Sequence, residues 1–294
     1  MDSLKILHRI YFGFDGKVDL YQEYLKNWEE QLPDYKIIHW NADNLPITIC
    51  EYTRELFKEK DHAFLSDYFR WWVLREYGGI YLDADIEIIN GEKFNILVEE
   101  LENNSEYHSF IGIEDISGYT AHSVACKKNS PLTQFMCSIY ENMGQIYHLR
   151  KRNMLLAPQL TLLYFYDQDS RENFEIPSII SPIIINNIMI YPQEYFSPLG
   201  YTNEGPILHN IHLENVCLCH HFSGSWLINT HNIKQNKQLL FSDYLKMNKK
   251  FSIKKTILRN INPSFQKSFL FKISRMFYRI LRFIYHEIKK NKDH

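Results

Sequence analysis

The fold is decided by residues 62–85, which read HAFLSDYFRWWVLREYGGIYLDAD. As far as position 77 the residues are apolar around almost the whole circumference of a helix, which is typical of a helix buried on all sides. Asp61 stands where a helix N-cap is expected, and Gly78 and Gly79 stand where the helix should end. The apolar run 80–82 then predicts a short buried strand directly after the helix.

Strands and helices are expected to alternate in the N-terminal part of the chain. Strand-like runs occur at 5–12 and 35–40, and apolar residues recur at helical spacing over 20–31 and 48–59. This alternation predicts an α/β domain with a mostly parallel central sheet. The apolar segment 176–191 is interrupted by prolines and an Asn-Asn pair, so it predicts a β-hairpin rather than a membrane-spanning helix.

The composition is that of a globular protein. The chain has 294 residues, of which 45% are hydrophobic and 15% aromatic, so it can bury a sizeable core in one large domain. Collagen-like, coiled-coil and disordered classes are excluded on the same grounds. The five cysteines are odd in number, and the first residues lack the pattern of a secretory signal, so we expect a reduced, cytoplasmic protein.

A basic tail is expected at the C-terminus. Residues 246–294 contain 14 Lys and Arg against two acidic residues, a charge of +12, whereas 1–245 carry −14. Apolar residues fall on one side of the tail and basic ones on the other, which predicts amphipathic helices outside a main domain of residues 1–245. Such helices lie on anionic membrane surfaces, and one expectation is that the tail binds peripherally to the inner face of the cell membrane. The alternative is docking on the body or on another subunit. Nucleic acid is not an expected partner, because the acidic body offers no basic groove.

Two carboxylates, Asp83 and Asp85, follow directly after the predicted strand 80–82. Residues i and i+2 of an extended chain point the same way, and ligands bind at the carboxyl ends of strands in open α/β sheets. Paired hard oxygens suit Mg²⁺ or Mn²⁺, which also takes oxygens from a diphosphate. Asp67 and Arg70 lie on one face of the buried helix, either as a private ion pair or as part of the same site.

Residues 62–85 closely resemble the Asp-x-Asp sugar-nucleotide segment of family 32 glycosyltransferases, which are related in this region to the large clostridial glucosylating toxins. The match joins Ser-Asp-x-x-Arg, Gly-Gly-x-Tyr-Leu-Asp and Asp-x-Asp at fixed spacings. Two weaker similarities extend it, because 8–13 (HRIYFG) resembles the opening strand of the family and 221–226 (HFSGSW) its closing His-to-Ser-Trp motif. The resemblance covers about residues 4–230.

The resemblance implies a GT-A type, Rossmann-like domain that binds a nucleotide-sugar donor together with Mn²⁺ or Mg²⁺. It further implies transfer with retention of anomeric configuration. We expect a UDP-sugar as donor and a saccharide or glycolipid, such as a lipid-linked saccharide, as acceptor in surface polysaccharide or glycan synthesis.

The resemblance also implies a role for individual residues. Asp85 would bind the metal, Asp83 would contact the ribose and the metal shell, and Asp67 and Arg70 would hold sugar hydroxyls and phosphate. The expected catalytic residues are Asp67, Arg70, Asp83 and Asp85. The expected substrate-binding residues are Tyr11 on the base, Asp67, Arg70, Tyr81, Asp83, Ser225 and Trp226.

A histidine is expected to complete the metal shell together with Asp83 and Asp85. The resemblance implies His221, and His220 competes for the role. A buried strand with incidental soft side chains is the alternative, and a structural zinc site with Cys217 and Cys219 is a further one.

The sequence does not identify a nucleophile for the retaining reaction. A covalent intermediate would need a carboxylate near the anomeric carbon, whereas front-face attack would not. Glu114 and Asp115 follow a strand-like run, and no spacing singles out either residue.

Two other function classes fit parts of the sequence. A metal-dependent phosphotransferase or nuclease would need further carboxylates beside Asp83 and Asp85. A non-enzymatic carbohydrate-binding or membrane-associated protein would carry the same acidic pair without catalysis.

Overall fold

The computed structural model describes residues 3–16, 18–115, 118–143, 157–169, 179–202, 205–208, 211–223 and 240–246. The chain divides into two units, Met1–Phe241 and Ser242–His294, and the first contains the α/β domain. The predicted basic helices fall outside the described residues, and so do Ser225 and Trp226. Among the helices that are described, none is both long and apolar enough to span a membrane.

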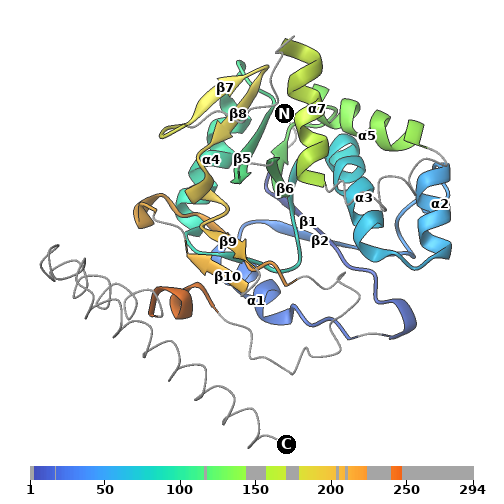
Figure 1. Ribbon diagram of the computed structural model, residues 1–294, viewed down its shortest axis with the longest axis horizontal. Coiled ribbons are helices and arrows are strands. Elements are labelled where there is room, and N and C mark those ends of the chain that lie inside the picture. Colours follow the sequence, from blue (N-terminus) through green and yellow to red (C-terminus); the bar gives the residue numbers. More distant parts are fainter. Residues whose placement is uncertain are drawn as a thin grey trace, which may run out of the picture. The chain divides into compact units, whose positions relative to one another are not determined.

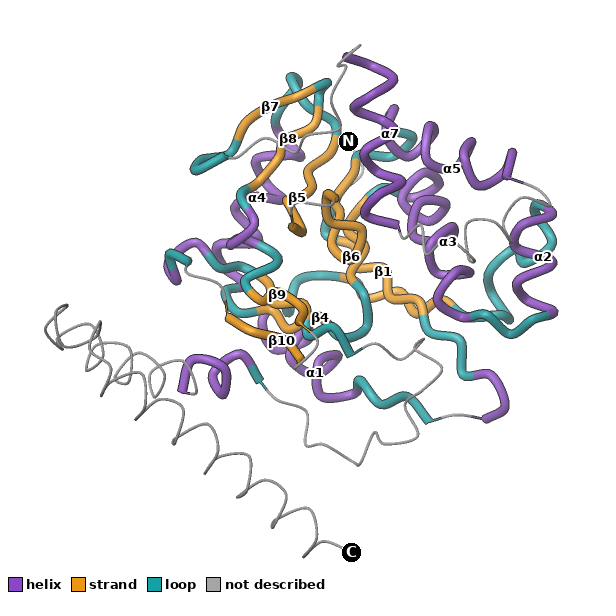
Figure 2. Tube along the Cα trace, in the orientation of Figure 1, coloured by secondary structure: helices purple, strands orange, loops and turns teal. Residues whose placement is uncertain are grey.

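The described part of the domain alternates strands with helices (Figures 1 and 2). Its strands are β1 (Ile6–Ile10), β2 (Lys36–Trp40), β3 (Gly79–Leu82), β4 (Ile86–Ile88), β5 (Ser109–Asp115), β6 (Gly118–Cys126), β7 (Ile183–Ile185), β8 (Ile188–Tyr191), β9 (Leu199–Thr202), β10 (Gly205–Leu208) and β11 (Leu218–His220). Its α-helices are α1 (Gln22–Gln31), α2 (Glu51–Lys58), α3 (His62–Tyr77), α4 (Gly91–Asn103), α5 (Pro131–Met143) and α7 (Ala157–Asp169). Short 3₁₀ turns are η1 (Phe14–Gly16), η3 (Gln193–Tyr195) and η4 (Leu213–Asn215).

The central sheet has seven strands in the order β2-β1-β3-β6-β5-β8-β7. Strands β1, β2, β3, β5 and β8 run in one direction, whereas β6 and β7 run in the other. The predicted α/β class with a mostly parallel central sheet is therefore confirmed. Two small antiparallel pairs, β9 with β10 and β4 with β11, lie outside the large sheet.

Helices cover both faces of the large sheet. Helices α2, α3, α5 and α7 share one hydrophobic core with the sheet, and α1 and α4 share a second one (Figure 1). Successive side chains of a strand point to opposite faces, so Tyr81 of β3 lies in the first core while Ile80 and Leu82 lie in the second. The strand that leads into the acidic pair is thus buried on both sides.

The junction between α3 and β3 forms as the sequence predicts. The Asp61 carboxylate accepts a hydrogen bond from the Phe64 backbone N–H and so caps α3. Gly78 and Gly79 end the helix with φ values of 69° and 96°, which a side chain would make costly. A Cβ on Gly79 would also lie 2.7 Å from the Ile6 carbonyl oxygen. The two glycines therefore let β3 start beside β1 directly after the helix.

Helix α1 fixes the position of strand β4. The indole N–H of Trp28 donates to the Ile86 carbonyl at 2.7 Å, and the Asn27 side chain bonds both the N–H and the C=O of Ile88. Trp28 is completely buried, so it also anchors α1 in the second core. Strand β4, which follows the acidic pair, is therefore held from the side opposite to its partner β11.

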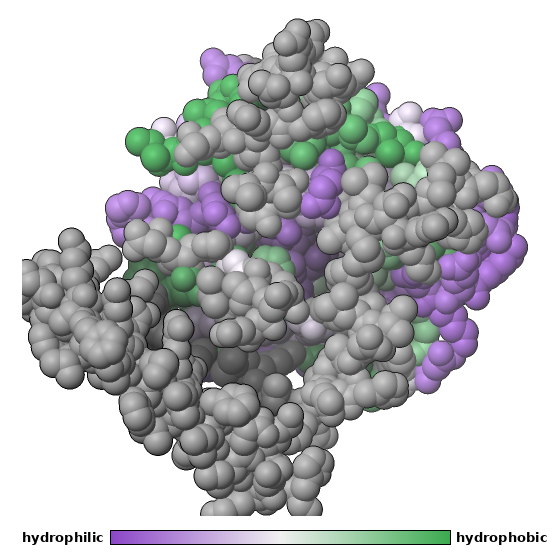
Figure 3. Space-filling model, viewed as in Figure 1, coloured by the Kyte–Doolittle hydropathy of each residue, from purple (hydrophilic) through white to green (hydrophobic). Residues whose placement is uncertain are grey.

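The predicted hairpin is present as β7 and β8. Asn186 and Asn187 form its two-residue turn, both with positive φ, which is the conformation that asparagine tolerates in such turns. Ile180 and Ile184 remain exposed near this hairpin, where Figure 3 shows apolar surface. The five cysteines are all free.

Candidate active site

Asp83 and Asp85 lie in a tight turn at the end of β3. The backbone N–H of Ile86 donates to the Asp83 carbonyl at 3.1 Å, so the chain turns here instead of continuing as a strand. The prediction that Asp83 and Asp85 point the same way because the chain is extended is therefore wrong. The two carboxylates nevertheless converge. The Asp85 side chain keeps 9% of its surface exposed, whereas the Asp83 side chain keeps 25%.

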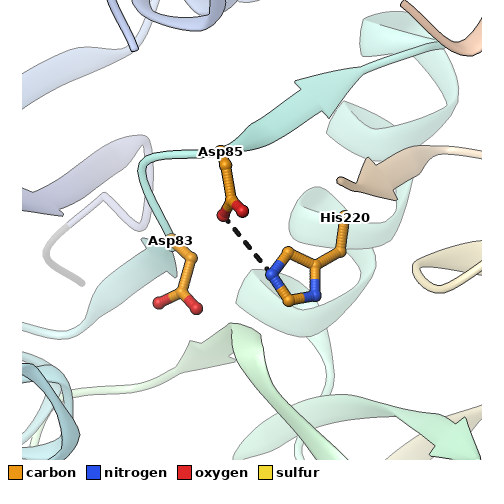
Figure 4. Close-up of side chains that lie close together, drawn as sticks. All are labelled: Asp83, Asp85 and His220. Atoms are coloured by element: carbon orange, nitrogen blue, oxygen red, sulfur yellow. Dashed lines mark ion pairs between the residues drawn. The ribbon is translucent and has the colours of Figure 1, made fainter. Parts of the chain in front are cut away.

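His220 completes a cluster with the two aspartates (Figure 4). Strand β11 pairs with β4 so that His220 is opposite Ile86, and its Nε2 lies 3.3 Å from Asp85 Oδ1. One ligand atom from each of Asp83, Asp85 and His220 lies within 4.8 Å of the others. No other such cluster of His, Cys, Asp and Glu occurs among the residues that the structure describes.

The charges in this cluster stabilise one another. Burial alone would raise the pKa of Asp85, but His220 and the hydrogen bonds from Ser223 hold this pKa well below its usual value. Burial alone would lower the pKa of His220, but the charge of Asp85 and the hydrogen bond to it raise this pKa to about 9. At neutral pH a charged imidazole therefore balances the carboxylates.

The donor set fits a divalent cation such as Mn²⁺ or Mg²⁺. Carboxylate oxygens are the preferred ligands of these hard ions, and a neutral imidazole nitrogen is an acceptable ligand for Mn²⁺. A cation between Asp83, Asp85 and His220 would balance the carboxylate charge that the proton on His220 balances without it. The cluster is thus built around a place for positive charge.

His221 lies away from this cluster. Its Nε2 is 2.8 Å from Glu87 Oε2, and its ring stacks on Tyr24 with the centroids 4.9 Å apart. Consecutive residues of a strand end point to opposite sides, so only one of the two neighbouring histidines can reach Asp85. The geometry favours His220, the competitor, over His221, the residue that the resemblance implied.

Arg70 lies beneath the acidic pair and connects it to α3. Its guanidinium donates to Asp67 Oδ1 at 2.8 Å and lies 3.6 Å from Asp83 Oδ1. Further N–H groups donate to the carbonyls of Ser66 and Ala121. Only 6% of Arg70 is exposed, so Arg70 contacts the acidic pair from the buried side.

Tyr81 supports Asp83 from the same side. Its hydroxyl donates to Asp83 Oδ1 at 2.6 Å, and Arg70 lies over its ring with 4.9 Å between the guanidinium carbon and the centroid. Burial, then the nearby carboxylates, raise the pKa of Tyr81 well above its usual value despite Arg70, so this hydroxyl remains a donor. Tyr81, expected to bind substrate, therefore contacts Asp83 from the buried side.

Tyr11 lies at the end of β1 rather than in the acidic cluster. Its hydroxyl donates to the Val18 carbonyl, and Tyr21 packs edge-on against its ring. Tyr21 in turn hydrogen-bonds Ser223, whose backbone N–H donates to Asp85 Oδ2 at 2.9 Å. A chain of contacts thus links the predicted base-binding residue to the aspartates.

The sequence assigns no role to His122 or Ser197 and leaves Glu114 as one of two candidate nucleophiles, but all three residues lie close together beside the acidic pair. The backbone carbonyl of His122 in β6 accepts a hydrogen bond from the Asp83 N–H. The centroid of the His122 ring lies 4.3 Å from that of the His220 ring. Its Nε2 is 2.9 Å from the Ser197 hydroxyl and 4.0 Å from a Glu114 carboxylate oxygen. Burial, and then the nearby His220, lower the pKa of His122 well below its usual value, so this ring is uncharged. A histidine inside an apolar strand was the available signal for His122, and no pattern points to Ser197.

Comparison with known proteins gives one family match. Residues 19–102 match the family model described as "Glycosyltransferase sugar-binding region containing DXD motif", a span that includes Asp67, Arg70, Asp83 and Asp85. No curated protein sequence matches the chain.

Two similar solved structures carry glycosyltransferase titles. The first, titled "PaToxG Glycosyltransferase", is 15% identical over 56% of this chain and 69% of that chain, with a TM-score of 0.44. The second is a glycosyltransferase involved in the glycosylation of the major capsid of PBCV-1, 9% identical over 73% of this chain and 92% of that chain, with a TM-score of 0.39.

Proposed function

We propose that the chain, whose residues 19–102 match the DXD sugar-binding region of glycosyltransferases, is a glycosyltransferase that transfers a sugar from a UDP-sugar with retention of configuration. The acceptor that we propose is a saccharide or a lipid-linked saccharide of a surface polysaccharide or glycan. The observation that carries the proposal is the convergence of Asp83, Asp85 and His220 on one point at the end of β3.

We propose that Asp83, Asp85 and His220 hold a divalent cation, Mn²⁺ or Mg²⁺. When bound, the cation supplies Lewis-acid stabilisation of the diphosphate leaving group of the donor. The choice of His220 in place of His221 is supported by its 3.3 Å approach to Asp85 and by the separate pairing of His221 with Glu87. The Asp83 side chain keeps 25% of its surface exposed, and this part would be accessible to the donor.

The residues beneath the aspartates keep Asp83 in one orientation. Tyr81 and Arg70 both contact Asp83 Oδ1, which leaves Oδ2 for a ligand. The inward contacts of Arg70 support a positioning role rather than the direct phosphate contact that the resemblance implied. Asp67 keeps 14% of its side chain exposed and remains our candidate for a donor sugar hydroxyl.

The proposal also includes a contact with the donor base and binding to a membrane surface. Tyr11, half-buried at the end of β1, offers an aromatic ring for the base. Ser225 and Trp226 remain proposed donor contacts through the resemblance alone. The charge of the tail 246–294 supports peripheral binding to an anionic membrane surface on the cytoplasmic side.

The test is nucleotide release from a panel of sugar nucleotides in the presence of Mn²⁺. We expect release from one UDP-sugar and its loss on addition of a chelator. Asp85→Asn should lower turnover by at least about 100-fold with an unchanged circular dichroism spectrum. His220→Ala should lower turnover as well, and the neighbouring His221→Ala, checked for folding, serves as the matched control.

Other outcomes would contradict the proposal. Full turnover of Asp85→Asn, or of the wild type in chelator, would remove the cation from the mechanism. Cleavage of nucleic acid would favour a phosphotransferase or nuclease, and no reaction with any donor would favour a carbohydrate-binding protein.

A further inference from the structure

The His220 ring lacks the hydrogen bond that usually orients a metal-binding histidine. Such histidines normally donate their second ring N–H to a carboxylate, a carbonyl or water, and this fixes the ring. The Nδ1 atom of His220 is buried and has no hydrogen-bond partner among the described residues. Nε2 contacts Asp85, and packing must therefore limit the rotation of the ring on its Nδ1 side.

Two rings pack against His220 instead. The His122 ring lies 4.3 Å from it between centroids, tilted by 31°, and the Phe222 ring lies at 4.2 Å, tilted by 44°. Phe222 has φ of 49°, a left-handed conformation that is uncommon for a residue other than glycine. Planar rings at these separations attract one another and limit rotation.

His122 is itself held in place through both its backbone and its ring. It is 2% exposed on the central strand β6, and its carbonyl accepts the Asp83 N–H at 2.8 Å. The hydroxyl of Ser197, which is completely buried, lies 2.9 Å from His122 Nε2. The ring against His220 is thus anchored by a hydrogen bond to a residue of a different segment of the chain.

We propose that His122 is a positioning residue, anchored by Ser197, which orients His220 toward the cation held with Asp83 and Asp85. The inference rests on the proposed metal site and extends it to two residues outside the segment that matches the DXD family. Ring packing takes the place of the hydrogen bond that His220 Nδ1 does not make.

The test measures Mn²⁺ binding by the full chain without donor, using titration calorimetry and the ¹⁴N couplings of bound Mn²⁺ in pulsed electron paramagnetic resonance. His122→Ala should weaken Mn²⁺ binding by about tenfold, the lower end of the range for residues that support a metal ligand. Ser197→Ala should weaken it about fivefold, as expected for the loss of one neutral hydrogen bond. In both variants the imidazole coupling should decrease or broaden.

Thr133→Val is the matched control. It also removes a buried hydroxyl with local hydrogen bonds, to Ser130, but at the start of α5. It should lower the melting temperature without changing the Mn²⁺ affinity or the coupling, whereas a positioning role changes both.

Unchanged affinity and coupling in folded His122→Ala would overturn the inference. If His122→Ala does not fold, unchanged values in Ser197→Ala would overturn it equally, and weakened ones would support it. A wild type that binds no Mn²⁺ would overturn the proposed metal site as well, so the two failures are distinguishable.

Discussion

His8 is expected to make the domain less stable as the pH falls from 7 toward 4. This residue of β1 has no exposed surface, and its Nδ1 lies 3.0 Å from the indole nitrogen of Trp40. An indole N–H only donates, so Nδ1 must accept. The proton is therefore on Nε2, which donates to the Gly78 carbonyl at 2.7 Å. The folded state thus selects one neutral tautomer, and it does so at the glycine pair that starts β3.

The magnitude follows from the pKa of His8. Burial, partly offset by the Gly78 hydrogen bond, lowers this pKa from 6.5 to about 4. The unfolded chain therefore binds the proton first as the pH falls, and the stabilisation present above pH 6.5 is lost toward pH 4. At roughly 1.4 kcal/mol per pKa unit, the complete loss is about 3 kcal/mol.

The assay is urea unfolding of the wild type and His8→Gln at pH 7.5 and pH 4.5. Glutamine does not titrate, and other ionisable groups affect both proteins alike. The difference in the free energy of unfolding between wild type and variant should shrink by about 2 kcal/mol on acidification. A difference that stays constant within about 0.5 kcal/mol would refute the assigned neutral state of His8.

Three further changes test the support of the acidic pair. Arg70→Met should destabilise the domain by about 3–5 kcal/mol, because Asp67 and Asp83 lose their buried partner, and denaturant unfolding measures this; a loss below about 1 kcal/mol would contradict it. Gly79→Ala should cost more than about 1 kcal/mol, because its φ of 96° and the Ile6 carbonyl oppose a Cβ, and an unchanged melting temperature would disprove this. Tyr81→Phe removes the hydrogen bond to Asp83 and should weaken Mn²⁺ binding about fivefold in calorimetry, a prediction that equal affinities would rule out.

The sequence could predict the elements of the fold wherever local signals agree. The capped apolar helix, the glycine pair and the short strand after it appear as α3 and β3 at the expected residues. The Asn186-Asn187 turn was likewise readable, because few residues adopt positive φ in succession. The order of the strands was not readable, since pairing of β3 with β6 joins residues far apart in the sequence.

The candidate site was predictable in its acidic half and less so in its histidine. Asp83 and Asp85 follow from their place after a buried strand, although a turn rather than an extended chain brings them together. Which of His220 and His221 reaches them depends on the register of β11 against β4, which no local pattern determines. Ser197 reaches His122 only through the tertiary fold, so no motif could indicate it.

The central claim is that a cation at Asp83, Asp85 and His220 binds the donor diphosphate, and UDP binding measured with and without Mn²⁺ tests it most directly. For the wild type, Mn²⁺ should tighten UDP binding by at least about tenfold, and Asp85→Asn should remove this gain while retaining the fold. Equal UDP affinity with and without Mn²⁺, or an undiminished gain in Asp85→Asn, would contradict the account.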